Sequence, residues 1–84
     1  MKATFLNDLD LIIALKKGDT NGYTFLVNLY HKKLCTYAFG LTNDYDLAED
    51  IVQNVFMSIW KNRFKLKEEF VIKSYLYKSV YNEF

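Results

Sequence analysis

The stretch that decides the fold is DYDLAEDIVQNVFMSIWK, from Asp44 to Lys61. Its apolar residues recur at the spacing of an α-helix with one buried side, which predicts a core-facing helix. These residues are Ala48, Ile51, Val52, Val55, Phe56, Ile59 and Trp60. The polar residues between them are Glu49, Asp50, Gln53 and Asn54. This polar side is either a solvated face or a docking surface, and the stretch by itself leaves both interpretations open.

Length and composition predict one small folded domain. The chain has 84 residues, which is near the lower limit for a self-sufficient core, but 51% are hydrophobic and 18% are aromatic. It contains no proline and only three glycines, which favours helices joined by short connections. The single cysteine, Cys35, has no partner for an internal disulfide, which fits a reducing compartment. We therefore expect a cytoplasmic protein.

The N-terminal sequence MKATFLNDLDLIIALKK superficially resembles a signal peptide. Asn7, Asp8 and Asp10 interrupt its apolar run and no small-residue cleavage site follows, so we expect no signal peptide. No segment approaches the roughly 18 consecutive apolar residues that a membrane span needs. The sequence predicts a soluble protein without a membrane span.

Four helical segments emerge from the 3.6-residue period, and they predict an all-α fold, a compact bundle of about four helices. They cover about Asp8–Lys17, Asn21–Leu41, the opening stretch, and a last helix from about Val71. Candidate caps are Asn7 or Asp8, Asp19 or Thr20, and the residues 42–44, while Gly18 is a stop signal. Residues 61–69 read as a loop with room for one helical turn.

The expected inward-facing residues lie on three of these helices. On the first they are Leu9, Ile12 and Ile13, with Leu11 and Leu15 beside them; on the second, Leu26, Leu29, Tyr30, Leu34, Tyr37, Ala38 and Leu41; on the last, Ile72, Leu76 and Val80. The last helix reaches Phe84 without a stop signal, which predicts that these residues are a piece of a longer chain.

Charge is divided along the chain although its formal sum is +1. Residues 44–50 hold four acids and no base, whereas residues 61–78 hold six bases and two acids. Two solvated faces would explain this division. The basic segment is also interleaved with aromatic residues, a pattern typical of single-stranded nucleic acid binding, where cations contact phosphates and rings stack on bases. The aromatic residues are Phe64, Phe70, Tyr75, Tyr77 and Tyr81.

No pattern predicts an enzyme. His31 stands alone among lysines, Cys35 has no nearby base in the sequence, and neither metal-ligand spacing nor a phosphate-binding glycine loop is present. We expect no catalytic residue, no metal site and no cofactor. A rival hypothesis, a helical adaptor that binds a protein partner without nucleic acid, explains the acidic side but leaves the lysine and aromatic segment unexplained.

The strings DLAEDIVQNVFMSIW and SYLYKSVYNEF, separated by a short loop, resemble region two of the extracytoplasmic-function (ECF) sigma factors of the sigma-70 family. These are bacterial initiation factors that bring RNA polymerase to promoters. The resemblance covers about Leu9 to Phe84 and implies one region-two domain over residues 1–84. The family's second domain, a helix-turn-helix that reads the minus-thirty-five element, is absent from these residues.

The resemblance implies that the third helix docks on the clamp helices of the polymerase's largest subunit. The residues at the docking positions are Asp46, Glu49, Asp50, Gln53, Asn54, Phe56 and Trp60. Phe56 and Trp60 also continue the apolar stripe, so each is a core residue in the alternative reading, which we favour for Trp60. An anti-sigma factor is a further implied partner.

The resemblance also implies that the fourth helix and the preceding loop melt the promoter's minus-ten element and hold its non-template strand. Asn82 would line the pocket for a flipped base together with Phe64. The full set of implied DNA-binding residues is Phe64, Lys65, Lys67, Lys73, Tyr75, Lys78, Tyr81 and Asn82. The chain departs from the family pattern at Tyr81, usually basic or small, at Tyr75 in place of tryptophan, and at Lys78 in place of arginine.

Overall fold

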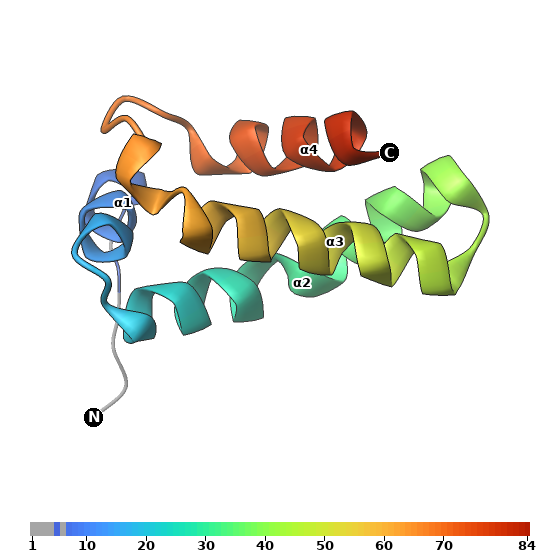
Figure 1. Ribbon diagram of the computed structural model, residues 1–84, viewed down its shortest axis with the longest axis horizontal. Helices are drawn as coiled ribbons and strands as arrows, with labels where there is room; N and C mark the ends of the chain where they lie inside the picture. Colours follow the sequence, from blue (N-terminus) through green and yellow to red (C-terminus); the bar gives the residue numbers. More distant parts are fainter. Residues whose placement is uncertain (1–4, 6) are drawn as a thin grey trace.

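A computed structural model describes residue 5 and residues 7–84, which form four α-helices and one 3-10 turn (Figure 1). They are α1 (Asp8–Lys16), α2 (Thr20–Thr42), α3 (Tyr45–Lys61), η1 (Arg63–Lys65) and α4 (Ile72–Glu83). The all-α prediction is confirmed, and each helix begins and ends within about one residue of its predicted position. The short turn η1 occupies the loop where one helical turn was expected.

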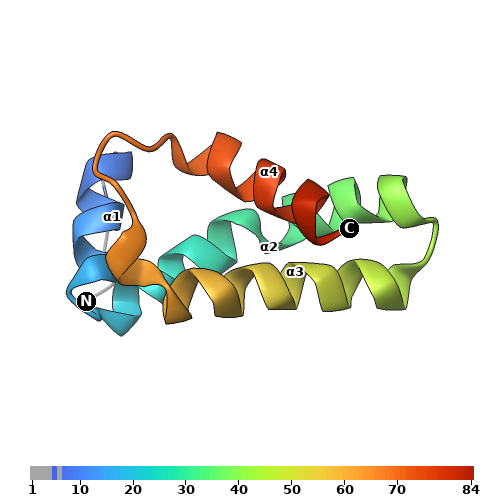
Figure 2. The ribbon, with the colours of Figure 1, turned by 45° about the horizontal axis from the view of Figure 1, so that its top comes forward.

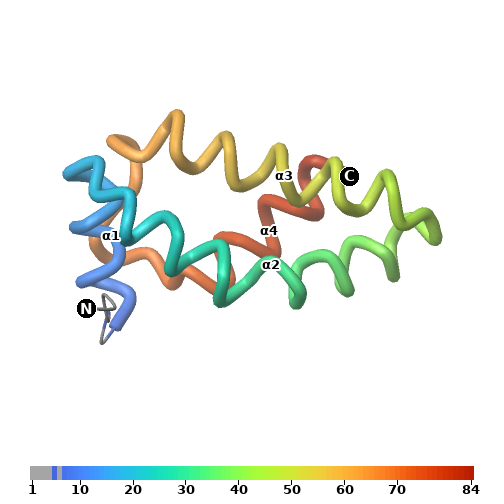
Figure 3. Tube along the Cα trace, turned by 90° about the horizontal axis from the view of Figure 1, so that it is seen from below, coloured from blue at the N-terminus to red at the C-terminus, as the bar shows by residue number. Residues whose placement is uncertain are grey.

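Helices α2 and α3 run antiparallel and side by side, and α4 packs over this pair (Figures 1 and 2). The shorter α1 crosses one end of the pair, where it contacts both α2 and η1. Seen from below, α2 and α3 form the near layer and α4 lies behind them (Figure 3). None of the helices in the described ranges is long and apolar enough to cross a membrane.

Side-chain caps decide where three helices begin. The Asn7 side chain accepts from the Asp10 N–H at 2.9 Å, Asp19 accepts from Asn21 at 2.9 Å, and Asp44 accepts from Leu47 at 3.1 Å. Each bond satisfies one backbone donor that the first turn of a helix leaves without a partner. The structure thus selects Asn7, Asp19 and Asp44 from the candidates that the sequence offered.

The turn between α2 and α3 depends on a left-handed residue. Asn43 has φ 55° and donates its backbone N–H to the Phe39 carbonyl at 2.8 Å, which closes the last turn of α2. Asparagine tolerates this conformation better than most residues. The rings of Phe39 and Tyr45 stack across the turn with centroids 3.9 Å apart. Backbone and side chains together therefore reverse the chain within two residues.

The core follows the predicted stripes with two exceptions. The α3 stripe of Ala48, Ile51, Val52, Val55, Phe56 and Ile59 is buried, and so are Ile72, Leu76 and Val80 of α4. Leu9 and Leu29, however, are 43% and 44% exposed, so their prediction as inward-facing residues was wrong.

Both errors arise because a neighbouring helix covers only part of each helix surface. In α1 the buried side is formed by Leu11, Ile12 and Leu15, and Leu9 points away from it. Leu29 lies two turns beyond Gly22 on the same side of α2. Gly22 faces Ala14 of α1 so closely that a Cβ there would lie 3.0 Å from the Ala14 Cβ. Because α1 crosses only the start of α2, it covers Gly22 and leaves Leu29 to solvent (Figure 3).

We expect Leu34→Ala to lower the free energy of unfolding by about 2–5 kcal/mol, because the Leu34 side chain is fully buried between the helices. Leu29→Ala, on the same helix but half-exposed, is the matched control and should cost well under half as much. Equilibrium urea denaturation followed by circular dichroism measures both. Equal losses for the two variants would contradict the packing described here.

Candidate functional site

The outer side of α3 presents a continuous polar strip to solvent. We define the α3 outer face as the exposed side chains of Asp46, Glu49, Asp50, Gln53, Asn54 and Met57. These positions lie opposite the buried stripe, so the packing of α3 turns them outward. The structure therefore places five of the seven predicted polymerase-binding residues on one helix face.

Met57 was missed by the sequence analysis. Its side chain is 64% exposed in the middle of the α3 outer face. It lies four residues after Gln53 and seven after Asp50, so all three share one side of the helix. That spacing alone would have separated Met57 from the buried stripe. An exposed thioether among polar groups adds an adaptable apolar contact to the face.

Phe56 and Trp60 do not belong to this face. Phe56 is buried, with a relative exposure of 3%. Its ring stacks with the His31 ring, and the two centroids are 6.4 Å apart. Trp60 is half-buried and packs against Tyr23 with centroids 5.1 Å apart. The structure thus places Phe56 in the core and Trp60 at its edge, in line with the core alternative. Both side chains lie on the core side of α3 and not among its outer side chains.

Asn54 stands at the edge of the α3 outer face that borders α4. Its amide Nδ2 donates to the Glu83 carboxylate of α4 at 3.5 Å. This long bond links α3 to the last turn of α4. The Asn54 side chain is therefore less available to a binding partner than the side chains of Asp50 and Gln53.

A groove runs between α2 and α3 beside the outer face. Two hollows of about 530 and 370 Å³ meet at His31. Glu49 and Cys35 line the larger hollow, while Gln53 and Met57 line the smaller one. Three residues of the outer face, Glu49, Gln53 and Met57, thus border a recess at their side, which enlarges the surface that a partner could cover.

Cys35 in this groove has an altered acidity. Burial raises the pKa of its thiol, and the nearby Glu49 carboxylate raises that pKa further. The Cys35 Sγ lies 3.8 Å from His31 Nε2 one helical turn earlier. Among the described residues no group of three or more potential metal ligands occurs, and this pair is not extended by a third.

The single arginine of the basic segment, Arg63, makes contacts within the fold. The Arg63 guanidinium lies 4.4 Å from the Trp60 ring centroid and 4.5 Å from that of Phe64. Its Nη1 donates to the Trp60 carbonyl at 2.8 Å, and the residue is half-buried. Such cation–π contacts stabilise local packing. Arg63 therefore holds η1 against α3, and its charge is less accessible than those of the lysines.

The remaining lysines of the segment are exposed, and so are two of its aromatic rings. Lys65, Lys67, Lys73 and Lys78 reach solvent. Phe64 is 67% exposed and Tyr81 60% exposed. Phe64 is steadied by Arg63, which leaves much of its ring open for stacking. Tyr77 instead packs edge-on against Tyr37 of α2, with centroids 5.0 Å apart.

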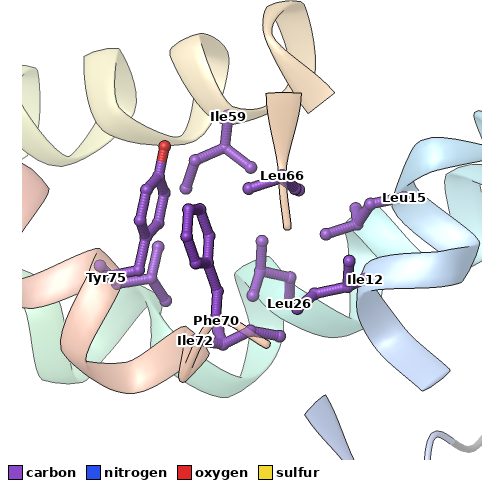
Figure 4. A pocket seen from close by; sticks show the side chains of 9 residues that line it. Ile12, Leu15, Leu26, Ile59, Leu66, Phe70, Ile72 and Tyr75 are labelled. Atoms are coloured by element: carbon purple, nitrogen blue, oxygen red, sulfur yellow. The ribbon is translucent and has the colours of Figure 1, made fainter. Parts of the chain in front are cut away.

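Tyr75 is half-buried and stacks on Phe70 with centroids 5.3 Å apart. Figure 4 shows both rings at the side of a small apolar cavity of about 10 Å³, with the Tyr75 hydroxyl pointing toward α3. A cavity of this size and lining has no polar group to hold a water molecule. The Tyr75 ring is thus part of the core boundary, and its hydroxyl is the part that reaches the surface.

A separate hollow of about 210 Å³ lies between α3 and α4. Tyr75 and Asn82 line it together with Ser58, Ser79, Val55, Ile59 and Glu83. Phe64 does not. Helix α4 runs away from η1 (Figure 2), and Asn82 lies ten residues after Ile72, a rise of about 15 Å along the helix axis. The structure therefore does not bring Phe64 and Asn82 together, contrary to the shared pocket that the resemblance implied.

Comparison with known families gives one match, in which residues 26–84 correspond to sigma-70 region 2. The chain belongs to the sigma-70 region 2 family. The match spans most of α2 and all of α3, η1 and α4, so both candidate surfaces lie within it. No curated protein and no solved structure matches the chain significantly.

The family settles the class of function. Sigma-70 region 2 is a non-enzymatic transcription initiation factor domain that binds core RNA polymerase and the minus-ten promoter element. The predicted function is therefore confirmed at this level, and the adaptor hypothesis without nucleic-acid binding was wrong.

We expect alkylation of Cys35 by iodoacetamide to reach half its maximal rate at a pH above the ordinary value for a cysteine thiol. The reason is that burial and the Glu49 carboxylate both raise the Cys35 pKa. Glu49→Gln removes the charge contribution, so its rate profile should shift to lower pH. Asp46→Asn, on the same helix, is the control. Superimposed profiles for Glu49→Gln and the unchanged protein would show that the carboxylate does not act on the thiol.

Proposed function

We propose that this chain is region two of an extracytoplasmic-function sigma factor and that it uses two surfaces. The α3 outer face docks on the clamp helices of the polymerase's largest subunit, and η1 with α4 melts the minus-ten element and holds its non-template strand. The observation that carries the proposal is the division of exposed charge: acids on α3, lysines on η1, the following loop and α4. The ECF subgroup rests on the strings DLAEDIVQNVF and SYLYKSVYNEF.

Docking centres on Asp50, Gln53 and Met57. They follow one another on a single side of α3, so a partner helix can meet all three at once. A carboxylate facing a basic partner forms charge-assisted hydrogen bonds, and Met57 supplies an apolar contact one helical turn after Gln53. Asp46 and Glu49 extend the negative potential toward the start of α3, where acids also suit the helix dipole.

DNA binding combines phosphate contacts with base contacts. Lys65, Lys67, Lys73 and Lys78 supply the positive charge, which is independent of sequence. Phe64 and Tyr81 offer exposed rings on which unpaired bases can stack. The α3–α4 hollow receives a flipped base, where the Asn82 amide provides both a donor and an acceptor and the Tyr75 hydroxyl lies beside it. In this arrangement Phe64 stacks a different base from the one that Asn82 reads.

An anti-sigma factor is the natural antagonist of such a domain. A protein that covers the α3 outer face and the adjoining α2–α3 groove would occupy the surface that polymerase needs. Because polymerase and promoter are both in the bacterial cytoplasm, the same proposal places this domain there.

We expect Asp50→Ala to weaken binding to the isolated polymerase clamp by about tenfold or more, because it removes one charge-assisted contact from the centre of the interface. The melting temperature should hardly change, since Asp50 is exposed. Biolayer interferometry and thermal denaturation measure the two quantities. Glu68→Ala, an exposed acid in the loop before α4, is the control and should bind normally. Unaltered clamp binding by Asp50→Ala would leave the α3 outer face as solvated surface only.

The two kinds of DNA contact predict different losses. Lys78→Ala should weaken binding to every single-stranded oligonucleotide alike and reduce the slope of log K against log salt by roughly one counterion. Asn82→Ala should cost about 1–3 kcal/mol for the preferred minus-ten sequence and little for others. Fluorescence anisotropy with a panel of oligonucleotides at several salt concentrations separates them. Equal losses for Asn82→Ala across all sequences would remove its base-reading role.

A further inference from the structure

The start of α4 is capped from outside its own segment. Val71 occupies the N-cap position in an extended conformation (φ −89°, ψ 110°), but a valine side chain cannot accept a hydrogen bond. Instead the Asp8 carboxylate Oδ2, from the first turn of α1, accepts from the Ile72 N–H at 3.0 Å. The two residues are 64 positions apart in the chain. A helix that lacks a local cap has thus obtained one from the opposite end of the described chain.

This bond matters because the first turn of any helix leaves backbone donors without partners. A carboxylate satisfies one donor and also favours the positive end of the helix dipole. Asp8 performs this role at a partly buried site. Immediately beside it, Ile12 of α1 and Ile72 of α4 line the same apolar cavity (Figure 4). One polar bond and one apolar contact therefore fix where α4 begins relative to α1.

The first turn of α4 carries groups assigned to DNA. Lys73 follows Ile72 directly, and Tyr75 comes two residues later. The six residues before α4 form no helix, so the connection from η1 does not by itself set the position of this turn. By contrast, the side chains of the α3 outer face lie on another helix. Among the described residues, none of these side chains forms a hydrogen bond with Asp8.

We propose that Asp8 is a positioning residue for promoter DNA binding: by capping α4 across the fold, it holds the first turn, with Lys73 and Tyr75, in the conformation that meets the DNA. The inference rests on the proposed function of α4 as the DNA-binding helix. It assigns a role in DNA binding to a residue that lies outside the helix proposed to contact DNA. It also predicts selectivity, because docking through α3 does not depend on this bond.

The test compares three variants with a matched control. Asp8→Ala removes the cap, Asp8→Asn keeps an acceptor oxygen at the same place, and Asp8→Ala combined with Val71→Asp moves the cap into α4's own segment. Val71 suits this design because its side chain is 59% exposed and its backbone already has an N-cap conformation. The new carboxylate would accept from the Lys73 or Ser74 amide and fix the same turn. Asp10→Ala, an exposed acid of the same first turn of α1, is the control.

Three readouts are measured on each protein: affinity for a single-stranded minus-ten oligonucleotide, affinity for the polymerase clamp, and hydrogen exchange of the amides of residues 72–74. We expect Asp8→Ala to lower DNA affinity about three- to tenfold and to accelerate exchange in the first turn of α4, with clamp affinity unchanged. Asp8→Asn should retain most of the affinity. The double variant should recover it, and Asp10→Ala should behave like the unchanged protein.

Several results would overturn the inference. One is unchanged exchange at residues 72–74 in Asp8→Ala, which would show that the bond does not cap α4. Another is a loss of DNA affinity that the double variant fails to recover, or a parallel loss of clamp affinity, because a general effect on the fold would then explain it. Lys78→Ala separates this failure from a failure of the proposed function. If Lys78→Ala weakens DNA binding while Asp8→Ala does not, only the positioning role is lost; if neither does, α4 is not the DNA-binding helix.

Discussion

The rest of the structure depends on the burial of one stripe of α3 between α2 and α4. Its six buried residues are in contact with helices on two sides, so α3 has a single side left for solvent. Apolar burial of this extent fixes the rotation of α3 about its axis, since turning the helix by even one position would expose an isoleucine or a valine. The residues of the α3 outer face gain their common orientation from this constraint and not from contacts among themselves. A charged surface in this domain is therefore a by-product of where its apolar residues must go.

The same reasoning applies to α4 with a different outcome. Ile72, Leu76 and Val80 are all buried, and they commit one narrow stripe of a short helix to the core. Lys73, Lys78 and Tyr81 are consequently exposed, while Tyr75 and Tyr77 fall at the margins and pack against neighbouring rings. Of the aromatic residues in the basic segment, only Phe64 and Tyr81 remain largely open. The exposed aromatic surface of this segment is thus smaller than a count of its aromatic residues would imply.

Local patterns in the sequence were sufficient for the helices, for short sets of candidate caps that include Asn7, Asp19 and Asp44, and for the buried stripes of α3 and α4. They failed where coverage by another element decides. Leu29 continues an apolar period but lies past the end of α1, and Leu9 lies on the uncovered side of a short helix. The direction of α4, which separates Phe64 from Asn82, and the Asp8–Ile72 bond both join distant parts of the chain, so no window of the sequence contains them. Arg63 looked like another solvated base because its two ring partners become neighbours only after η1 forms.

The left-handed turn at Asn43 has a consequence for the order in which this domain assembles. With the Phe39–Tyr45 stack, it closes the α2–α3 pair through residues that are near neighbours in the chain, so little loop entropy is lost in forming it. Joining α1 to α4 closes a loop of more than sixty residues for one hydrogen bond and a few apolar contacts. Low contact order favours early formation, and the weakest non-local junction is the first to open. The junction between α1 and α4 would then open before the α2–α3 hairpin does, while α4 keeps its packing on α2 and α3 through Ile72, Leu76 and Val80.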